Sequence, residues 1–138
     1  MDPFSLTVGC VSLISAIASV SRSVTDFVLS CRDARQDLAA VSRELVELDM
    51  TLHILKADTE AKGPHQLPND LRRHIGDIME NCSNILSDFE ELLRRYEGGG
   101  LDRAARWALS GRKDAEKMRA SLAAHKGALS LVVEAMTL

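Results

Sequence analysis

The chain has 138 residues, of which 46 % are hydrophobic, 27 % are charged and 4 % are aromatic. This length suits one domain that buries a single core without disulfides or metal, and the scarcity of aromatic side chains favours helix over sheet. The formal net charge of −3 predicts no general affinity for nucleic acid.

The first predicted helix, residues 3–29, contains a long uncharged segment. Nineteen residues separate Asp2 from Arg22 without a charge, which as helix spans roughly 28 Å, close to the hydrocarbon thickness of a bilayer. Six of the nineteen are Ser or Thr, which makes the segment marginal as a committed transmembrane span. No basic residue precedes it, unlike in a secretory signal. We expect a helix surrounded by others in the resting bundle that is able to enter lipid after release.

Small and bulky side chains form two neighbouring stripes along this helix, each with alternating spacings of three and four residues. Ridges of small side chains let another helix approach closely, in lipid as in a soluble bundle. The small-residue ridge consists of Ser5, Gly9, Ser12, Ala16, Ser19 and Ser23. The bulky stripe consists of Leu6, Cys10, Leu13, Ile17, Val20, Val24 and Phe27.

Two further long helices are predicted, over residues 31–60 and 69–97. Ser30 and Asp33 resemble a capping box that opens the second helix. A loop with Gly63, Pro64 and Pro68 separates the two helices. Helical spacing places one apolar stripe on each. These stripes are Leu38, Val41, Leu45, Leu48, Leu52 and Leu55, and then Leu71, Ile75, Ile78, Cys82, Ile85, Phe89, Leu92 and Tyr96.

The glycines Gly98–Gly100 end the third helix, and a short helix over residues 101–110 follows, with a kink or turn at Ser110-Gly111. A last helix is predicted over residues 112–136. Four long helices without strand patterns or repeats predict an all-α fold, an antiparallel four-helix bundle with an additional short brace-like helix. We expect residues 1–138 to form one domain, the N-terminal part of a longer protein.

Basic residues cluster around the single tryptophan. Residues 101–138 carry seven basic and four acidic side chains, whereas residues 32–97 carry nine basic and fourteen acidic ones. Basic side chains beside a tryptophan suit an anionic membrane surface. The alternative is a solvated basic face with Trp107 packed on the bundle as a brace. The candidate lipid contacts are Arg103, Arg106, Trp107, Arg112 and Lys113.

The sequence offers no catalytic constellation. The four histidines lack the spacing of metal ligands, and His125 fits a partly buried, hydrogen-bonded position on the last helix. Cys10, Cys31 and Cys82 form no CxxC pair and fit core positions in a reducing, intracellular setting. We therefore expect no enzyme activity, no metal and no cofactor.

Two segments carry a resemblance to a known family. The opening "MDPFSLTVGCVSLISAIASV" resembles that of the fungal HeLo-like domains, the N-terminal effector domains of many fungal NOD-like (STAND-type) receptors and of their partner cell-death proteins. The closing "RAARWALSGRKDAEKMRASLAAHKGALSLVVEAM" resembles the family's last segment, a short Trp-containing helix, a basic turn and a long helix. At the centre of that helix stands Leu122-Ala-Ala-His125-Lys126-Gly-Ala-Leu129.

The resemblance implies a helical bundle similar to the executioner domain of the mammalian necroptosis pseudokinase and to coiled-coil domains of plant resistance proteins. Such domains are cytoplasmic at rest, oligomerise on activation and disrupt the plasma membrane with the first helix. Carried over to this chain, the inserting segment runs from Phe4 to Val20. Its membrane-inserting side chains are Phe4, Leu6, Val8, Leu13, Ile14, Ile17 and Val20.

The expected function is therefore a cell-death effector domain of fungal innate immunity and heterokaryon incompatibility. Its expected partners are anionic plasma-membrane lipids, further copies of itself, and a NOD-like receptor or an amyloid-forming signalling module. The alternative is a non-lytic helical interaction or homo-oligomerisation module of a signalling receptor.

Overall fold

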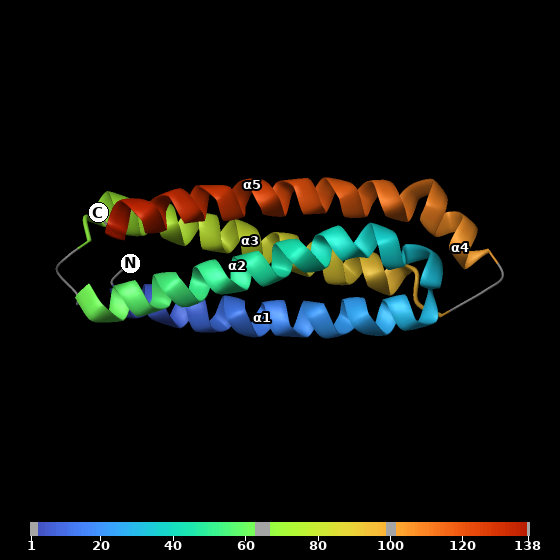
Figure 1. Ribbon diagram of the computed structural model, residues 1–138, viewed down its shortest axis with the longest axis horizontal. Coiled ribbons are helices and arrows are strands. Elements are labelled where there is room, and N and C mark those ends of the chain that lie inside the picture. The colour runs from blue at the N-terminus through green and yellow to red at the C-terminus, as the bar shows by residue number, and fades with distance from the viewer. Residues whose placement is uncertain (1–2, 63–66, 99–101, 138) are drawn as a thin grey trace.

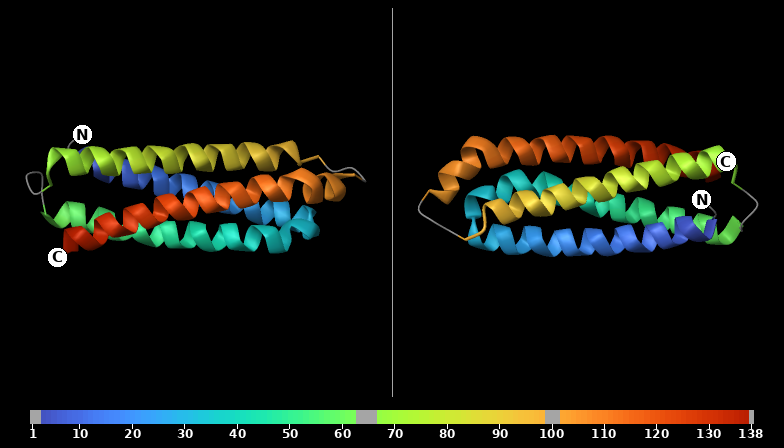
Figure 2. Two further views of the ribbon diagram at one scale, coloured as in Figure 1. Left: turned by 90° about the horizontal axis from the view of Figure 1, so that it is seen from above. Right: turned by 180° about the vertical axis from the view of Figure 1, so that it is seen from behind.

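Four long helices make up most of the molecule in the computed structural model, which describes residues 3–62, 67–98 and 102–137 and, within these, no side chains of residues 3–5, 62 and 137. The helices pack lengthwise against one another (Figures 1 and 2), and no strand occurs in the described ranges. They are α1 (Pro3–Ser30), α2 (Arg35–Lys62), α3 (Asn69–Arg95) and α5 (Arg112–Thr137). The prediction of an all-α four-helix bundle is confirmed.

Each long helix runs in the opposite direction to the one before it, as the colour order in Figure 1 shows. α1 packs mainly on α2 and α3, and α5 packs mainly on the same two helices. The four helices therefore surround one elongated core, and each helix turns a second face toward solvent.

The core is formed by the stripes that helical spacing predicts. All six residues of the α2 stripe are buried, and in the α3 stripe only Leu71 and Ile85 are partly exposed. Met79, Leu86 and Leu93 join the α3 stripe in the core. A helix with two neighbours buries a band wider than a single three–four stripe, which explains these additional residues.

The connection between α1 and α2 differs from the expected capping box. Ser30 Oγ donates a hydrogen bond to the carbonyl oxygen of Phe27, 3.0 Å away, and so closes α1 instead of opening the next helix. A short 3₁₀ turn, η1 (Arg32–Ala34), follows without a side-chain cap, and α2 starts only at Arg35. Because the hydroxyl is used within α1, Ser30 is not available as an N-cap.

Helical structure also continues across the expected kink near Ser110. The short helix α4 (Arg103–Arg106) leads into a π-helical turn, η2 (Trp107–Gly111), and directly into α5. In Figure 1 this segment bends around the end of the bundle where α1 ends and α2 begins. Upstream of it, Gly98 adopts a left-handed φ of 90°, which only glycine takes without strain.

Candidate functional site: α1 and the bundle end beside it

The bulky stripe of α1 is the face that packs into the bundle. All seven of its residues are at most 4 % exposed. Of the seven candidate membrane-inserting residues, Leu6, Leu13, Ile17 and Val20 belong to this buried face, and the side chain of Phe4 lies outside the described part. In the closed bundle these four buried side chains cannot touch lipid.

The opposite face of α1 is open to solvent, which corrects the expectation of a helix surrounded on all sides. Val8 and Val11 are 52 % and 50 % exposed, and Ser12, Ser15 and Ala18 are exposed as well, whereas Ile14 is half-buried. The reason is geometric, because α1 packs mainly on two neighbouring helices and these cover only one side of it. The result is an exposed helix face without a charge from Val8 to Ser21.

By length and composition alone, Leu6–Ser30 could cross a membrane, although core helices and signal sequences pass the same test. Only 28 % of the most apolar part of this segment is buried. The segment is therefore not the fully enclosed core helix that its composition would suggest.

The small-residue ridge borders α3. A Cβ placed on Gly9 would lie 2.6 Å from Met79 Cε, so the missing side chain makes room for that methionine. Farther along, Ser19 Oγ donates a hydrogen bond to Glu90 Oε1 at 3.1 Å, and Ala16 and Ser19 line a small cavity between the two helices. Ser12 is exposed and the side chain of Ser5 lies outside the described part. Within the described residues, the ridge is thus where α3 comes close to α1.

Trp107 is a buried brace rather than a surface anchor, the second of the two arrangements considered above. It is 1 % exposed, and its ring centroid lies 5.2 Å from that of Phe27 and 5.4 Å, edge to face, from that of Tyr96. Its Nε1 donates a hydrogen bond to Asp37 Oδ2 at 2.9 Å. As a lipid contact of the closed bundle, Trp107 is therefore excluded by its burial.

Three of the four basic candidates around Trp107 already have partners. Arg103 donates to the carbonyl oxygen of Ser30 at the end of α1, and Arg106 pairs with Asp102 at 3.4 Å. Arg112 Nε lies 3.0 Å from Asp37 Oδ1. Arg103 thus links α4 to the end of α1, Arg112 links the start of α5 to α2, and the Arg106 pair is local. Lys113, which is exposed, is the basic side chain of this group that has no ion pair with a described residue.

Sequence reasoning did not identify Asp37 as the residue that organises this end. It lies on α2, 70 positions before Trp107, so no local spacing connects the two. Nor did it identify the contact between Tyr96 and Ser110, whose hydroxyl oxygens lie 2.6 Å apart. Only the packing of the helices brings these polar groups together.

His125 and Lys126, at the centre of α5, make two different contacts. His125 bonds within α5, and Lys126 links α5 to α2. His125 Nδ1 donates to the carbonyl oxygen of Ser121 at 2.7 Å, which confirms a partly buried, satisfied histidine. Lys126 Nζ lies 2.8 Å from Glu44 Oε2 and also pairs with Glu47. Hydrogen bonds to these two carboxylates raise the pKa of Lys126. This motif therefore has a structural role in the bundle.

The described residues offer little for covalent or metal chemistry. They contain no group of three or more His, Cys, Asp or Glu side chains that could hold a metal ion. Burial raises the pKa of the Cys10 and Cys82 thiols to about 11, so both are protonated and unreactive near neutral pH. The distinctive features of the molecule are thus surfaces and helix contacts.

Comparison with protein-family models, curated proteins and solved structures found no match to this chain.

Proposed function

We propose that this chain is a membrane-targeting effector domain, held inactive as a closed bundle in the cytoplasm, that inserts α1 into the plasma membrane once copies are clustered. The observation that carries the proposal is the segment of α1 before Arg22, which has no charge and whose exposed face from Val8 to Ser21 is therefore uncharged as well. The resemblance of the first and last segments to fungal HeLo-like domains supports a role in cell death during fungal innate immunity and incompatibility. A NOD-like receptor or an amyloid-forming module is then the partner that clusters it.

Release of α1 in water is strongly unfavourable. Burying an aliphatic or aromatic side chain contributes about 1.5–3 kcal/mol, so withdrawing the bulky stripe from the core costs roughly 10–20 kcal/mol. A bilayer offsets this cost, since it accepts the bulky stripe and the exposed Val8 and Val11 together. Clustering raises the local concentration of α1 helices and favours their association after insertion. In this proposal the closed state is therefore stable in solution, and it opens at a membrane once copies are clustered.

The test is dye release from phosphatidylserine-containing liposomes by the domain fused to an oligomerising module. Val11→Glu places a charge on the exposed face of α1, and its matched control, Val46→Glu, places one on the exposed face of α2. Both valines are at least half exposed, so both variants should keep the closed fold. A charge within the bilayer costs about 2.5 kcal/mol or more, so Val11→Glu should lower leakage at least tenfold and Val46→Glu by less than twofold.

A variant lacking residues 1–21 gives the baseline for this experiment. If the clustered wild-type domain releases no more dye than this deletion, the membrane proposal is wrong. Equal leakage by the Val11→Glu and wild-type domains would also contradict insertion of α1.

A non-lytic interaction module is the second candidate, and one observation favours it. Six of the eight large hydrophobic side chains that are exposed in the described chain belong to α1 and α2. These are Val8, Val11, Leu29, Val46, Met50 and Ile54. Exposed apolar side chains concentrated on two adjacent helices are typical of a surface that another helix covers. Sedimentation of the unfused domain that shows a dimer sensitive to both Val11→Glu and Val46→Glu, without dye release, would support this alternative.

A further inference from the structure

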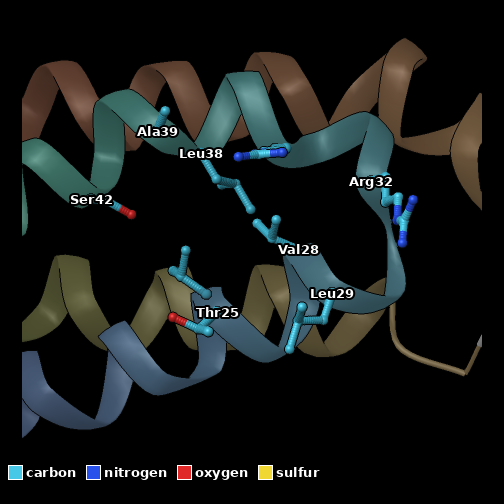
Figure 3. A pocket seen from close by; sticks show the side chains of 9 residues that line it. Thr25, Val28, Leu29, Arg32, Leu38, Ala39 and Ser42 are labelled. Carbon is cyan, nitrogen blue, oxygen red and sulfur yellow. The ribbon is translucent and has the colours of Figure 1, made fainter.

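An open groove of about 870 Å³ lies between the last turns of α1 and the first turns of α2. The η1 turn separates the two helices here, and Figure 3 shows Val28 of α1 and Leu38 of α2 pointing toward each other across the gap. Val24 and Leu38 are buried at its floor, and Ser42 faces it from α2. The volume is within the range of pockets that hold small organic ligands.

The charge at this groove is entirely positive. Its nine lining residues include Arg32 and Arg35 and no acidic side chain. Both arginines are exposed, and neither has an ion pair or hydrogen bond with a described residue through its side chain. By contrast, Arg103, Arg106 and Arg112 at the same end of the bundle are all engaged. Two free guanidinium groups beside an apolar floor attract a carboxylate or a phosphate.

The neighbouring cavity between α1 and α3 has the opposite character. It is smaller, about 260 Å³, and Asp26, Glu90 and Glu97 line it together with Arg94. An anion would be repelled there. Of these two neighbouring cavities, the α1–α2 groove is the one that combines an apolar floor with unpaired positive charge.

We propose that the α1–α2 groove binds a soluble single-chain anionic amphiphile of the long-chain carboxylate class. In this proposal the carboxylate pairs with the arginines at the rim of the groove, and the alkyl chain lies along Val24, Val28 and Leu38. Charge complementarity selects the headgroup, and the buried floor selects an apolar tail over a short acid. This inference does not depend on the membrane function proposed above, because it concerns the closed bundle in solution.

Such a ligand would stabilise the closed state. It touches α1 and α2 at once, so it binds the bundle and not a state in which the two helices have separated. Mass action then favours the closed form as the ligand concentration rises.

The experiment is calorimetric titration of the chain with sodium dodecanoate below its critical micelle concentration at pH 8. The Arg32→Gln/Arg35→Gln variant should bind at least tenfold more weakly than the wild type. The matched control, Arg22→Gln/Arg43→Gln, removes two other exposed arginines outside the groove and should bind within twofold of the wild type. Ser42→Phe fills the groove with both arginines in place and should also weaken binding at least tenfold.

The choice of ligands separates the possible explanations. Acetate, which carries the charge without the chain, and dodecyl maltoside, which carries the chain without the charge, should both bind at least tenfold more weakly than dodecanoate. Equal binding of dodecanoate by the wild type and the Arg32→Gln/Arg35→Gln variant overturns the proposal. So does binding of phosphatidylserine vesicles that depends on these two arginines while dodecanoate does not bind. If Ser42→Phe fails to fold by circular dichroism, the two arginine pairs decide the outcome.

Discussion

Asp37 of α2 accepts a hydrogen bond from Trp107 Nε1 at 2.9 Å, although 70 positions separate the two residues. The other oxygen of the same carboxylate lies 3.0 Å from Arg112 Nε. One acidic side chain thus contacts the first residue of the π-helical turn η2 and the first residue of α5, and the rings of Phe27 and Tyr96 lie beside the indole. The end of the bundle where α1 meets α2 is therefore fixed by a polar contact inside an apolar cluster.

Loss of the Asp37 carboxylate should destabilise the domain more than loss of its exposed partner. Asp37→Ala leaves the buried Trp107 N–H without an acceptor, which costs about 1–3 kcal/mol of unfolding free energy. Arg112→Ala removes an ion pair whose arginine is largely solvated, which costs about 0–1 kcal/mol. Urea unfolding followed by circular dichroism measures both. A smaller effect for Asp37→Ala than for Arg112→Ala would show that the indole hydrogen bond contributes little.

Two glycines on the same helical run should respond to alanine in opposite ways. A Cβ on Gly111 would lie 2.4 Å from Trp107 Cε3, so Gly111→Ala must displace the indole and should cost about 1–3 kcal/mol. A Cβ on Gly127 would meet nothing within 4 Å, and Gly127→Ala should add about 0.5–1 kcal/mol through helix propensity. Thermal and urea unfolding of the two variants give the comparison. Stabilisation by Gly111→Ala would contradict the close packing of Trp107 on η2.

The buried thiols should be unreactive while the bundle is folded. Burial raises the pKa of Cys10 and Cys82 to about 11, so at pH 8 their thiolate fraction is about a hundredfold lower than that of an unfolded cysteine. Alkylation with iodoacetamide, read by peptide mass spectrometry, should be at least a hundredfold slower at these cysteines in buffer than in about 6 M urea. Fast labelling of Cys10 in buffer at pH 8 would mean that α1 opens readily.

The same two thiols set a pH dependence at the alkaline side. Their pKa is higher in the folded chain than in the unfolded chain, so the unfolded state ionises first. Their contribution to stability is complete below about pH 8 and declines as the pH rises from about 8.5 toward 11. Replacing Cys82 by Ala should make the alkaline decline of the urea midpoint shallower. An unchanged slope would rule out this origin.

The Lys126 cluster should give a pH dependence at the acidic side. The hydrogen bond from Lys126 lowers the pKa of Glu47, so this pair stabilises the fold above the unfolded glutamate pKa, and the contribution is lost as the pH falls through the lowered value. Lys126→Met should destabilise the domain at about pH 7. It should also flatten the decline of the urea midpoint between about pH 6 and pH 3. Lys113→Met, which removes an exposed lysine without an ion pair in the described chain, is the control and should change neither. A decline in Lys126→Met as steep as in the wild type would contradict this account.

The helical stripes could be predicted from the sequence because side-chain spacing alone decides which face of a helix is apolar. For Leu45 and Leu52 in α2, and for Ile75 and Phe89 in α3, the period of the apolar residues is sufficient to place them in the core. The start of α2 was not predictable in this way. Ser30 is suited both to opening a helix and to closing one, and only the geometry of the turn decides between them.

The environment of α1 and of Trp107 depended on tertiary packing. Composition shows that α1 carries no charge before Arg22, but whether Val11 faces a third helix or water depends on how many helices surround α1. Likewise, the sequence places arginines near Trp107 but does not show that Asp37 and Arg112 meet beside it. Contacts between residues so far apart in the chain leave no periodic signal.

The contact between Gly9 and Met79 has a consequence for how copies of this chain can join. Met79 of α3 lies against the small-residue ridge at Gly9, and Glu90 accepts a hydrogen bond from the ridge at Ser19. A helix from another copy can use that ridge only after α3 has left it. The closed bundle and a ridge-to-ridge assembly are therefore mutually exclusive, and they compete for one surface. Assembly through the ridge therefore carries the cost of separating α3 from α1, so the closed bundle is favoured at low protein concentration.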